Sequence, residues 1–376
     1  MMRRILFLTA MLSACAVTSA PADIIIGMHA PLTGFAAVDG KSARIATEIA
    51  IGKINAAGGL LGQKVQLQVF DDQGQGAQAV TIANKIVSDN AAILVIADSY
   101  SEPTRAAASI FQAAKMPYIS AVASHPDITK VGNYVFRGSQ LGEVQGGSTA
   151  VHIAKALKKS KVSIVTVDND YGSSLLNGFK AAMGAQGVTL VGEYSFTMAE
   201  RQFGSVVAGL RRDNADVIYI GGYWFQGGPL VSQIRAAGIT TPIISSGLAA
   251  QQFIKIAGPA AEGVMIVDAT GDDNANPEYP AFRAALRAQE AEANVFFSEI
   301  AHTAVDIAAN AIRRAGSTDR EKIRDALAST KDLRTMYGTL ASYTSGREII
   351  QRMPLSIVKD GKFAASGEME IWLPAP

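Results

Sequence analysis

Hydroxyl groups and small side chains follow two predicted buried strands, at positions where they could hold an anion. The residues concerned are Ser99, Tyr100 and Ser101 after the apolar run 93–97, and Val122, Ala123 and Ser124 after the run 118–120. Ser101 can cap a helix, because Pro103 is tolerated in a first helical turn. Main-chain amides and hydroxyls at a helix start suit a carboxylate. An ordinary helix cap without any ligand would account for Ser101 equally well.

Three consecutive aromatic residues follow a later predicted strand, 217–220. They are Tyr223, Trp224 and Phe225, placed after a glycine pair. Alternate side chains of an extended chain point in opposite directions, so all three cannot lie in one core. We expect at least one of them, Tyr223, to form a wall of a ligand site.

The sequence predicts no catalytic or metal-binding site. Residues 34–42 resemble a phosphate-binding loop, but five residues separate the two glycines where that loop has four. Neither a G-x-S-x-G nor an H-E-x-x-H motif occurs, and the four histidines are scattered without ligand spacing. We therefore expect no enzymatic activity, no cofactor and no metal. The acidic segment 271–274 is interpreted as a solvated loop, with calcium binding as the alternative.

Length and composition indicate two globular domains with large cores. The chain has 376 residues, of which 48% are hydrophobic and 18% charged. The formal net charge is +1, from 34 basic and 33 acidic residues. Removing residues 1–22 takes away Arg3 and Arg4 and leaves a charge near −1, so we expect no nucleic-acid partner.

The N-terminal 22 residues have the pattern of a secretory signal peptide. Two arginines precede a short apolar run, and Ala20-Pro21-Ala22 supplies small residues for cleavage before Asp23. Cys15, the only cysteine, follows Leu12-Ser13-Ala14 in a pattern that resembles a bacterial lipobox. We favour cleavage after Ala22 and a periplasmic protein, with lipid anchoring through Cys15 as the alternative.

Strand and helix patterns alternate along the rest of the chain. Residues 41–56 carry Ile45, Ile49 and Ile54 at helical spacing before a glycine stop. Further helices are predicted at 171–184, 203–212, 278–289, 297–315 and 319–329, and a hairpin around Asp360-Gly361. Strands that alternate with helices form parallel sheets covered by helices on both faces.

The same order of strands and helices recurs in the second half, where 215–222 parallels 91–98. We therefore predict an α/β fold of two Rossmann-like lobes, one of residues 23–140 and 272–338, the other of 141–271 and 339–376. Ligands of open α/β sheets bind beyond the carboxyl ends of the strands. Two such lobes facing each other would enclose a ligand between them.

Six further segments form a pattern through their order and spacing, namely 26–34, 54–62, 69–72, 79–87, 171–172 and 261–263. Through these segments the whole chain after the signal resembles the leucine/isoleucine/valine-binding branch of the periplasmic type I solute-binding proteins. The resemblance implies two lobes joined by three crossovers, a ligand at their interface and delivery to an ABC permease. It also implies that Ser101 and Ser124 hold a ligand carboxylate, while Tyr171 and Tyr223 close the site.

One departure from this family concerns the ligand. Amino-acid binders of the family usually carry an acidic residue at the position of Ser246, but Ser245-Ser246-Gly247 offers only hydroxyls. A buried ammonium without a partner would be costly. Asp39, Asp98 or Asp268 could replace that charge. The sequence therefore leaves the ligand open between a branched-chain or other amino acid and an aromatic or other organic carboxylate or an amide. We expect the protein to be a monomer. The alternative to transport is a ligand-sensing receptor of the same fold.

Overall fold

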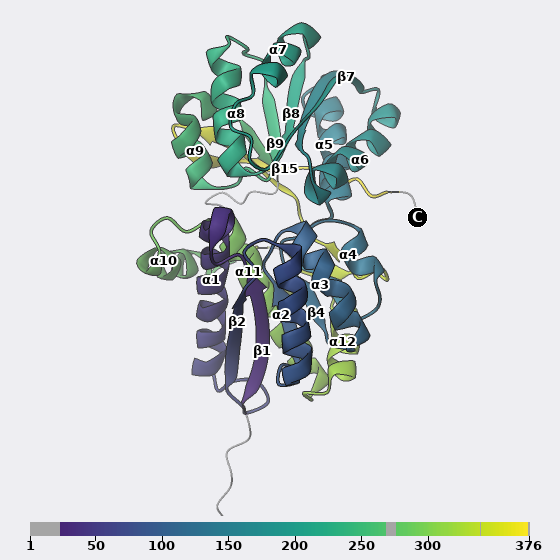
Figure 1. Ribbon diagram of the computed structural model, residues 1–376, viewed down its shortest axis with the longest axis vertical. Helices are drawn as coiled ribbons and strands as arrows, with labels where there is room; N and C mark the ends of the chain where they lie inside the picture. The colour runs from purple at the N-terminus through teal and green to yellow at the C-terminus, as the bar shows by residue number, and fades with distance from the viewer. Residues whose placement is uncertain (1–22, 268–275, 339, 375–376) are drawn as a thin grey trace, which may run out of the picture.

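The computed structural model describes residues 23–267, 276–338 and 340–374. It consists of two bodies, each a sheet between layers of helices, which meet at the middle of the molecule (Figure 1). We call the body that contains the first strand the first lobe, and the other body the second lobe. The predicted signal peptide and the acidic segment 271–274 lie outside the described residues.

The sheet of the first lobe has five parallel strands in the order β2-β1-β3-β4-β5. The strands are β1 (Ile24–Ala30), β2 (Val65–Asp71), β3 (Leu94–Ala97), β4 (Tyr118–Ser120) and β5 (Val135–Arg137). The helices are α1 (Ala37–Ala56), α2 (Gly76–Asp89), α3 (Ser101–Ala113), α4 (Asp127–Lys130), α10 (Tyr279–Gln289), α11 (Val295–Ala315) and α12 (Arg320–Ala328). Ile24 and Ile26 pack with α1, α11 and α12, whereas Ile25 packs with the layer of α2 and α3. This alternation buries both faces of the sheet.

The sheet of the second lobe has seven strands in the order β15-β14-β10-β9-β8-β6-β7. The strands are β6 (Lys161–Val167), β7 (Thr189–Phe196), β8 (Val217–Gly221), β9 (Ile243–Ser246), β10 (Met265–Val267), β14 (Pro354–Lys359) and β15 (Lys362–Glu368). The helices are α5 (Gly142–Lys155), α6 (Asp170–Met183), α7 (Gly204–Asp213), α8 (Trp224–Ala236) and α9 (Gln251–Ala257). The five parallel strands repeat the order of the first lobe, and the C-terminal hairpin adds β14 antiparallel to β10. The predicted α/β fold of two similar lobes is confirmed.

A small antiparallel sheet of β11 (Leu333–Arg334), β12 (Leu340–Tyr343) and β13 (Ile349–Ile350) packs on the first lobe. Ala341 and Ile349 join the core of β1 and α11, and the ring of Tyr343 lies 5.4 Å from that of Phe136. Our sequence-based division assigned residues 339–350 to the second lobe. Because these strands pack against the first, we propose that the boundary between the lobes falls after Ile350.

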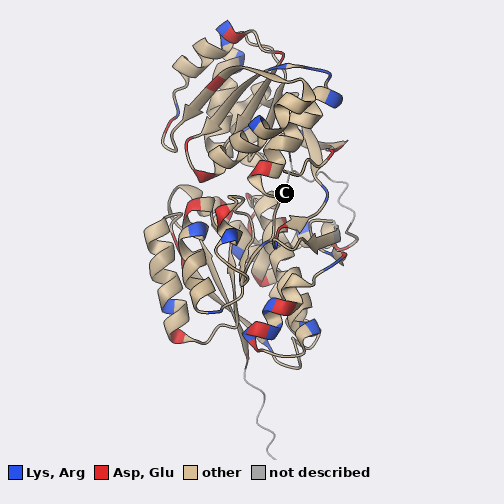
Figure 2. Cartoon of the chain, turned by 90° about the vertical axis from the view of Figure 1, so that its right-hand side faces the viewer, with Lys and Arg blue, Asp and Glu red and all other residues tan. Residues whose placement is uncertain are grey.

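The chain passes between the lobes three times: from β5 to α5, from β10 to α10, and from β13 to β14. Lys and Arg residues are interspersed with Asp and Glu residues along both lobes (Figure 2). Among the described residues, no helix is both long and apolar enough to cross a membrane. Short 3-10 turns lie at Gly34–Ala36, Gly184–Gln186 and Gly258–Ala261.

Candidate functional site

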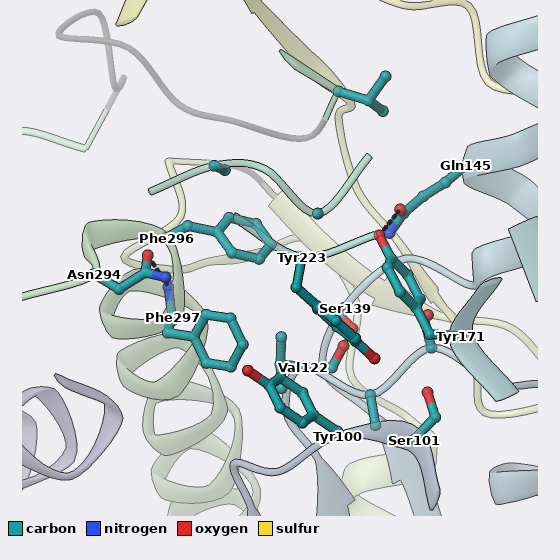
Figure 3. A pocket seen from close by; sticks show the side chains of 15 residues that line it. Tyr100, Ser101, Val122, Ser139, Gln145, Tyr171, Tyr223, Asn294, Phe296 and Phe297 are labelled. Atoms are coloured by element: carbon teal, nitrogen blue, oxygen red, sulfur yellow. Dashed lines mark hydrogen bonds between the residues drawn. The ribbon is translucent and has the colours of Figure 1, made fainter. Parts of the chain in front are cut away.

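A cavity lies between the lobes, beyond the carboxyl ends of strands from both sheets (Figure 3). Together with its opening to solvent it encloses about 620 Å³. It is lined by Tyr100, Ser101, Val122, Ala123, Ser124, Ser139, Gln145, Tyr171, Tyr223, Gly247, Ala249, Val267, Asn294, Phe296 and Phe297. The position agrees with the rule that open α/β sheets bind ligands where their strands end.

Five helices start at this cavity, namely α3, α5, α6, α8 and α11. Each contributes a lining residue from its N-terminal flank or its first turn: Ser101, Gln145, Tyr171, Tyr223 and Asn294 respectively. The first amides of a helix have no partner within the helix, and the helix dipole places partial positive charge at this end. Asn294 and Asn169 cap α11 and α6 with their side chains, but no side chain caps α3, α5 or α8. The combined field at the cavity favours an anion.

Ser124 places an unpartnered hydroxyl at the floor of the cavity. Its side chain is almost fully buried, and its Oγ has no hydrogen-bond partner. Leaving such a group unsatisfied costs about 1–3 kcal/mol. Ser101, the first residue of α3, is also buried at the cavity wall, whereas the Ser139 hydroxyl donates to the Val122 carbonyl oxygen at 3.0 Å. Ser124 and Ser101 are therefore the hydroxyls best placed to bind a ligand.

Aromatic rings from both lobes form one continuous wall of the cavity. Tyr100 of the first lobe packs against Tyr223 of the second with ring centroids 4.7 Å apart. Tyr171 stacks on Tyr223 at 5.4 Å, and Phe297 meets Tyr100 edge to face at 6.0 Å. Burial raises the pKa of the Tyr223 phenol, and its oxygen accepts from the Asn169 amide at 3.2 Å. These rings hold the lobes together and give the cavity an apolar side.

Asp39 lies behind this wall and does not line the cavity. Its carboxylate accepts hydrogen bonds from Tyr100 Oη at 2.7 Å, Asn294 Nδ2 at 2.8 Å and Trp224 Nε1 at 3.1 Å. Burial raises the pKa of the Asp39 carboxyl, and the three hydrogen bonds offset part of that rise. Trp224 belongs to the second lobe and the other three residues to the first, so this carboxylate fixes the cavity wall and also joins the lobes.

Eight of the ten predicted site residues line the cavity: Tyr100, Ser101, Val122, Ala123, Ser124, Tyr171, Tyr223 and Gly247. The structure does not bring Ser99 and Ser246 to it. Ser99 is fully buried beneath the start of α3, and the Ser246 hydroxyl is hydrogen-bonded to the Tyr219 hydroxyl at 3.0 Å inside the second lobe. Gly247 is required, because its φ is +84° and a Cβ there would lie 2.0 Å from the Gly222 carbonyl oxygen.

Seven lining residues are absent from our sequence-based set: Ser139, Gln145, Ala249, Val267, Asn294, Phe296 and Phe297. Asn294 carried a usable signal, because asparagine before an apolar helical run is a typical N-cap. Of the substitutes considered for the missing acidic residue, Asp39 and Asp98 do not line the cavity. Asp98 is buried elsewhere in the first lobe, and Asp268 lies outside the described residues. Within the described part of the chain, no cluster of three or more His, Cys, Asp or Glu side chains could hold a metal ion.

A cavity enclosed between two α/β lobes of like topology, joined by three chain crossings, defines a two-lobed solute-binding protein. The chain belongs to the periplasmic binding protein family, whose model matches residues 23–362. This confirms the resemblance seen in the sequence. The protein binds a solute and is not an enzyme.

Curated relatives and solved structures extend this similarity. The Leu/Ile/Val-binding protein homolog 3 of Brucella melitensis is 33% identical over 334 residues, which are 88% of this chain and 89% of the relative. A second relative is LivJ of Streptococcus pneumoniae, a branched-chain amino acid transporter substrate binding protein that was solved with isoleucine. It is 25% identical to this chain with a TM-score of 0.84, and the match covers 93% of this chain and all of LivJ. An ABC transporter solute binding protein of R. palustris, solved with benzoate, shares the fold with a TM-score of 0.83 at 21% identity, covering 94% and 98% of the two chains.

Proposed function

We propose that this protein captures a small carboxylate-bearing solute in the periplasm and delivers it to an ABC permease of the inner membrane. It acts as a monomer and is released from its signal peptide after Ala22. Ligand capture follows hinge closure, in which the first lobe binds the carboxylate and the second lobe covers the remainder. Permease delivery is supported by the similarity to LivJ of Streptococcus pneumoniae, a branched-chain amino acid transporter substrate binding protein.

The observation that carries the proposal is the unpartnered Ser124 hydroxyl at a cavity where five helices begin. A carboxylate oxygen there would accept from Ser124, from Ser101 and from the first amides of α3. Hydrogen bonds to charged groups contribute about 1.5–3 kcal/mol each when buried. A carboxylate would thus satisfy a hydroxyl that is otherwise left without a partner.

Closure accounts for the placement of Tyr171 and Tyr223. Both belong to the second lobe, and Tyr223 reaches across to pack on Tyr100 of the first. Moving the lobes apart would separate these rings and expose the carboxylate site to water. Closing them removes that water, so hydrogen bonds within the site become stronger and unpaired groups more costly.

Isothermal titration calorimetry, guided by a thermal-shift screen of amino acids, aromatic acids, 2-oxo acids and short fatty acids, tests this function. A ligand that binds only the native state raises the melting temperature. Ser124→Ala should weaken binding of the best carboxylate by roughly 5- to 150-fold, which corresponds to about 1–3 kcal/mol. Ser109→Ala is the matched control, because Ser109 is exposed on α3 away from the cavity.

Equal losses in Ser124→Ala and Ser109→Ala would contradict the assignment of the carboxylate site. Binding of neutral or cationic solutes, with no response to any carboxylate, would contradict the proposed ligand class. Delivery is tested separately by uptake of the identified solute in cells with and without the gene. Unchanged uptake would refute the transport role while leaving solute binding intact.

A further inference from the structure

We infer that the ligand is a monocarboxylate with an apolar body and no ammonium group, such as an aromatic acid or a branched 2-oxo acid, in preference to the corresponding α-amino acid. This inference rests on the proposed capture of a carboxylate. It concerns the second polar group of the ligand, which decides between the amino acid and its deaminated analogue. Four observations on the cavity support it.

The first observation is that the cavity lacks a charged partner for an ammonium. Among the described residues that line it, none is Asp or Glu. An ammonium has three donors and needs acceptors for all of them once water is excluded. The five helix starts around the cavity add partial positive charge, which repels a cation as strongly as it attracts a carboxylate.

The second observation is that four carbonyl and amide oxygens of the lining residues already have at least one hydrogen-bond partner each. Val122 O accepts from the Ser139 hydroxyl at 3.0 Å, and Ala123 O accepts from Arg137 Nη1 at 2.6 Å. The side-chain oxygen of Asn294 caps α11 by accepting from the Phe297 amide, and Gln145 Oε1 lies 3.5 Å from the Tyr171 hydroxyl (Figure 3). The site therefore presents donors to a ligand more readily than acceptors.

The third observation is that the buried carboxylate of Asp39, behind the tyrosine wall, cannot serve as the missing acceptor without loss. It already binds the Tyr100 hydroxyl, the Asn294 amide and the Trp224 indole. Turning it toward the cavity would leave those three buried donors without an acceptor. The carboxylate contributes to the shape of the site and not to charge recognition of a ligand.

The fourth observation concerns a second hollow on the far side of the tyrosine wall, which shares Tyr100, Ser101, Tyr171 and Tyr223 with the cavity. It contains two carboxylates, and both have partners. Asp170 pairs with Arg105 Nε at 2.7 Å, and Glu102 accepts from the Gly76 amide at 3.2 Å. Neither of them supplies a free negative charge at the cavity.

The apolar part of the lining defines the body of the ligand. Phe296, Phe297 and Val122 face the cavity together with the rings of Tyr100 and Tyr223 (Figure 3). Such walls bind a flat ring or a branched aliphatic chain through dispersion and edge-to-face contacts. A second charged group on the ligand would lie against these surfaces without compensation.

Matched pairs of ligands that differ only at the α-position test the inference by isothermal titration calorimetry. The pairs are 4-methyl-2-oxopentanoate with leucine, and phenylpyruvate with phenylalanine. We expect the 2-oxo acid to bind at least 10-fold more tightly than its amino acid in at least one pair. Gln145→Glu introduces an acceptor with negative charge at the cavity and should shift this ratio toward the amino acid by about 10-fold. Gln78→Glu is the control, because Gln78 is exposed on α2.

Tighter binding of the amino acid than of the 2-oxo acid in both pairs would overturn the inference and leave the proposed capture of a carboxylate standing. In that case Asp268→Asn would show whether this residue, which follows the lining residue Val267, supplies the charge. Absence of binding by every carboxylate tested would refute the proposed function and the inference with it. A ratio unchanged by Gln145→Glu would also count against the inference, because the ammonium would then have another partner.

Discussion

Asp98 is a buried acid whose ionisation should govern the stability of the first lobe. It follows β3, is completely buried, and neither oxygen of its carboxyl group has a hydrogen-bond partner. Burial raises the pKa of Asp98 from 3.8 to about 8, and the nearby Asp72 carboxylate adds to this rise. His29 and Tyr118 form the rest of the surrounding polar cluster, in which His29 is hydrogen-bonded to both Asp72 and Tyr118 at 2.7 Å.

The sign and size of the effect follow from proton linkage. Since the folded protein holds the Asp98 proton more tightly than the unfolded chain, the free energy of unfolding falls as pH rises from about 4 to about 8. Each pH unit within this window lowers the free energy of unfolding by about 1.36 kcal/mol, so the ionisation of Asp98 changes it by on the order of 5 kcal/mol in full. Below pH 4 the group is protonated in both states, and above pH 8 it is ionised in both, so the contribution is constant outside the window.

Urea unfolding at several pH values between 4 and 8.5, compared with Asp98→Asn, measures this contribution. Asparagine resembles the neutral acid in shape but cannot ionise. We expect the stability of the variant relative to wild type to increase by several kcal/mol from pH 4.5 to pH 8. Asp39 and the other ionisable groups that do not interact with Asp98 are present in both proteins, so their contributions cancel in the difference. Parallel stability curves across this range would show that Asp98 ionises normally and would refute the reasoning.

Two further substitutions, the first with a matched control, test the packing within the second lobe and the contact between the lobes. Gly178→Ala should destabilise the protein by about 1–3 kcal/mol, because a Cβ there would lie 2.0 Å from the Glu143 carbonyl oxygen where α6 meets α5. Gly52→Ala in α1 is the control, because a Cβ there meets no atom within 4 Å, and it should stabilise the protein by up to about 1 kcal/mol. Melting temperatures of the Gly178→Ala and Gly52→Ala variants that shift in the same direction would contradict this account. Trp224→Phe removes the indole that donates to Asp39 across the lobes and should weaken ligand binding about 10-fold, or about 1.4 kcal/mol. Calorimetric affinities equal to those of the wild type would show that this contact does not stabilise the closed form.

Local patterns in the sequence were sufficient to predict the lobes. The helix predicted at 41–56 corresponds to α1, and the hairpin around Asp360-Gly361 to β14 and β15. These elements have clear apolar periods and glycine or turn signals at their ends. Residues 340–350 contain the turn signal Ser345-Gly346 but no clear apolar period, and β13 has only two residues. Their place on the first lobe depends on contacts such as that of Arg137 with Glu348, which are 211 residues apart in the chain.

Eight of the fifteen residues that line the cavity lie in segments that follow predicted strands. Residues that follow a buried strand lie at the carboxyl edge of the sheet whatever the distant packing, so Ser101, Ser124 and Tyr223 could be predicted. Gln145 instead belongs to α5, which follows the crossing from the first lobe to the second, and Asn294 caps α11, which follows another helix, α10. Ser246 shows a different limit. The sequence indicates a hydroxyl near the site but does not show that it points into the second lobe toward Tyr219.

The proposed ligand preference depends on Asp39, which the sequence suggested as a charged partner for the ligand without showing where its side chain lies. Asp39 is separated by 61, 185 and 255 residues from the three donors that surround it. As a free carboxylate at the cavity it would favour an ammonium, and the site would then suit an amino acid. Tyr100, Asn294 and Trp224 donate hydrogen bonds to Asp39 and hold it behind the wall. Asp39 therefore organises the cavity but leaves the described lining without negative charge. The hydrogen bonds that hold Asp39 behind the wall therefore support a ligand without an ammonium group, and the sequence alone does not reveal them.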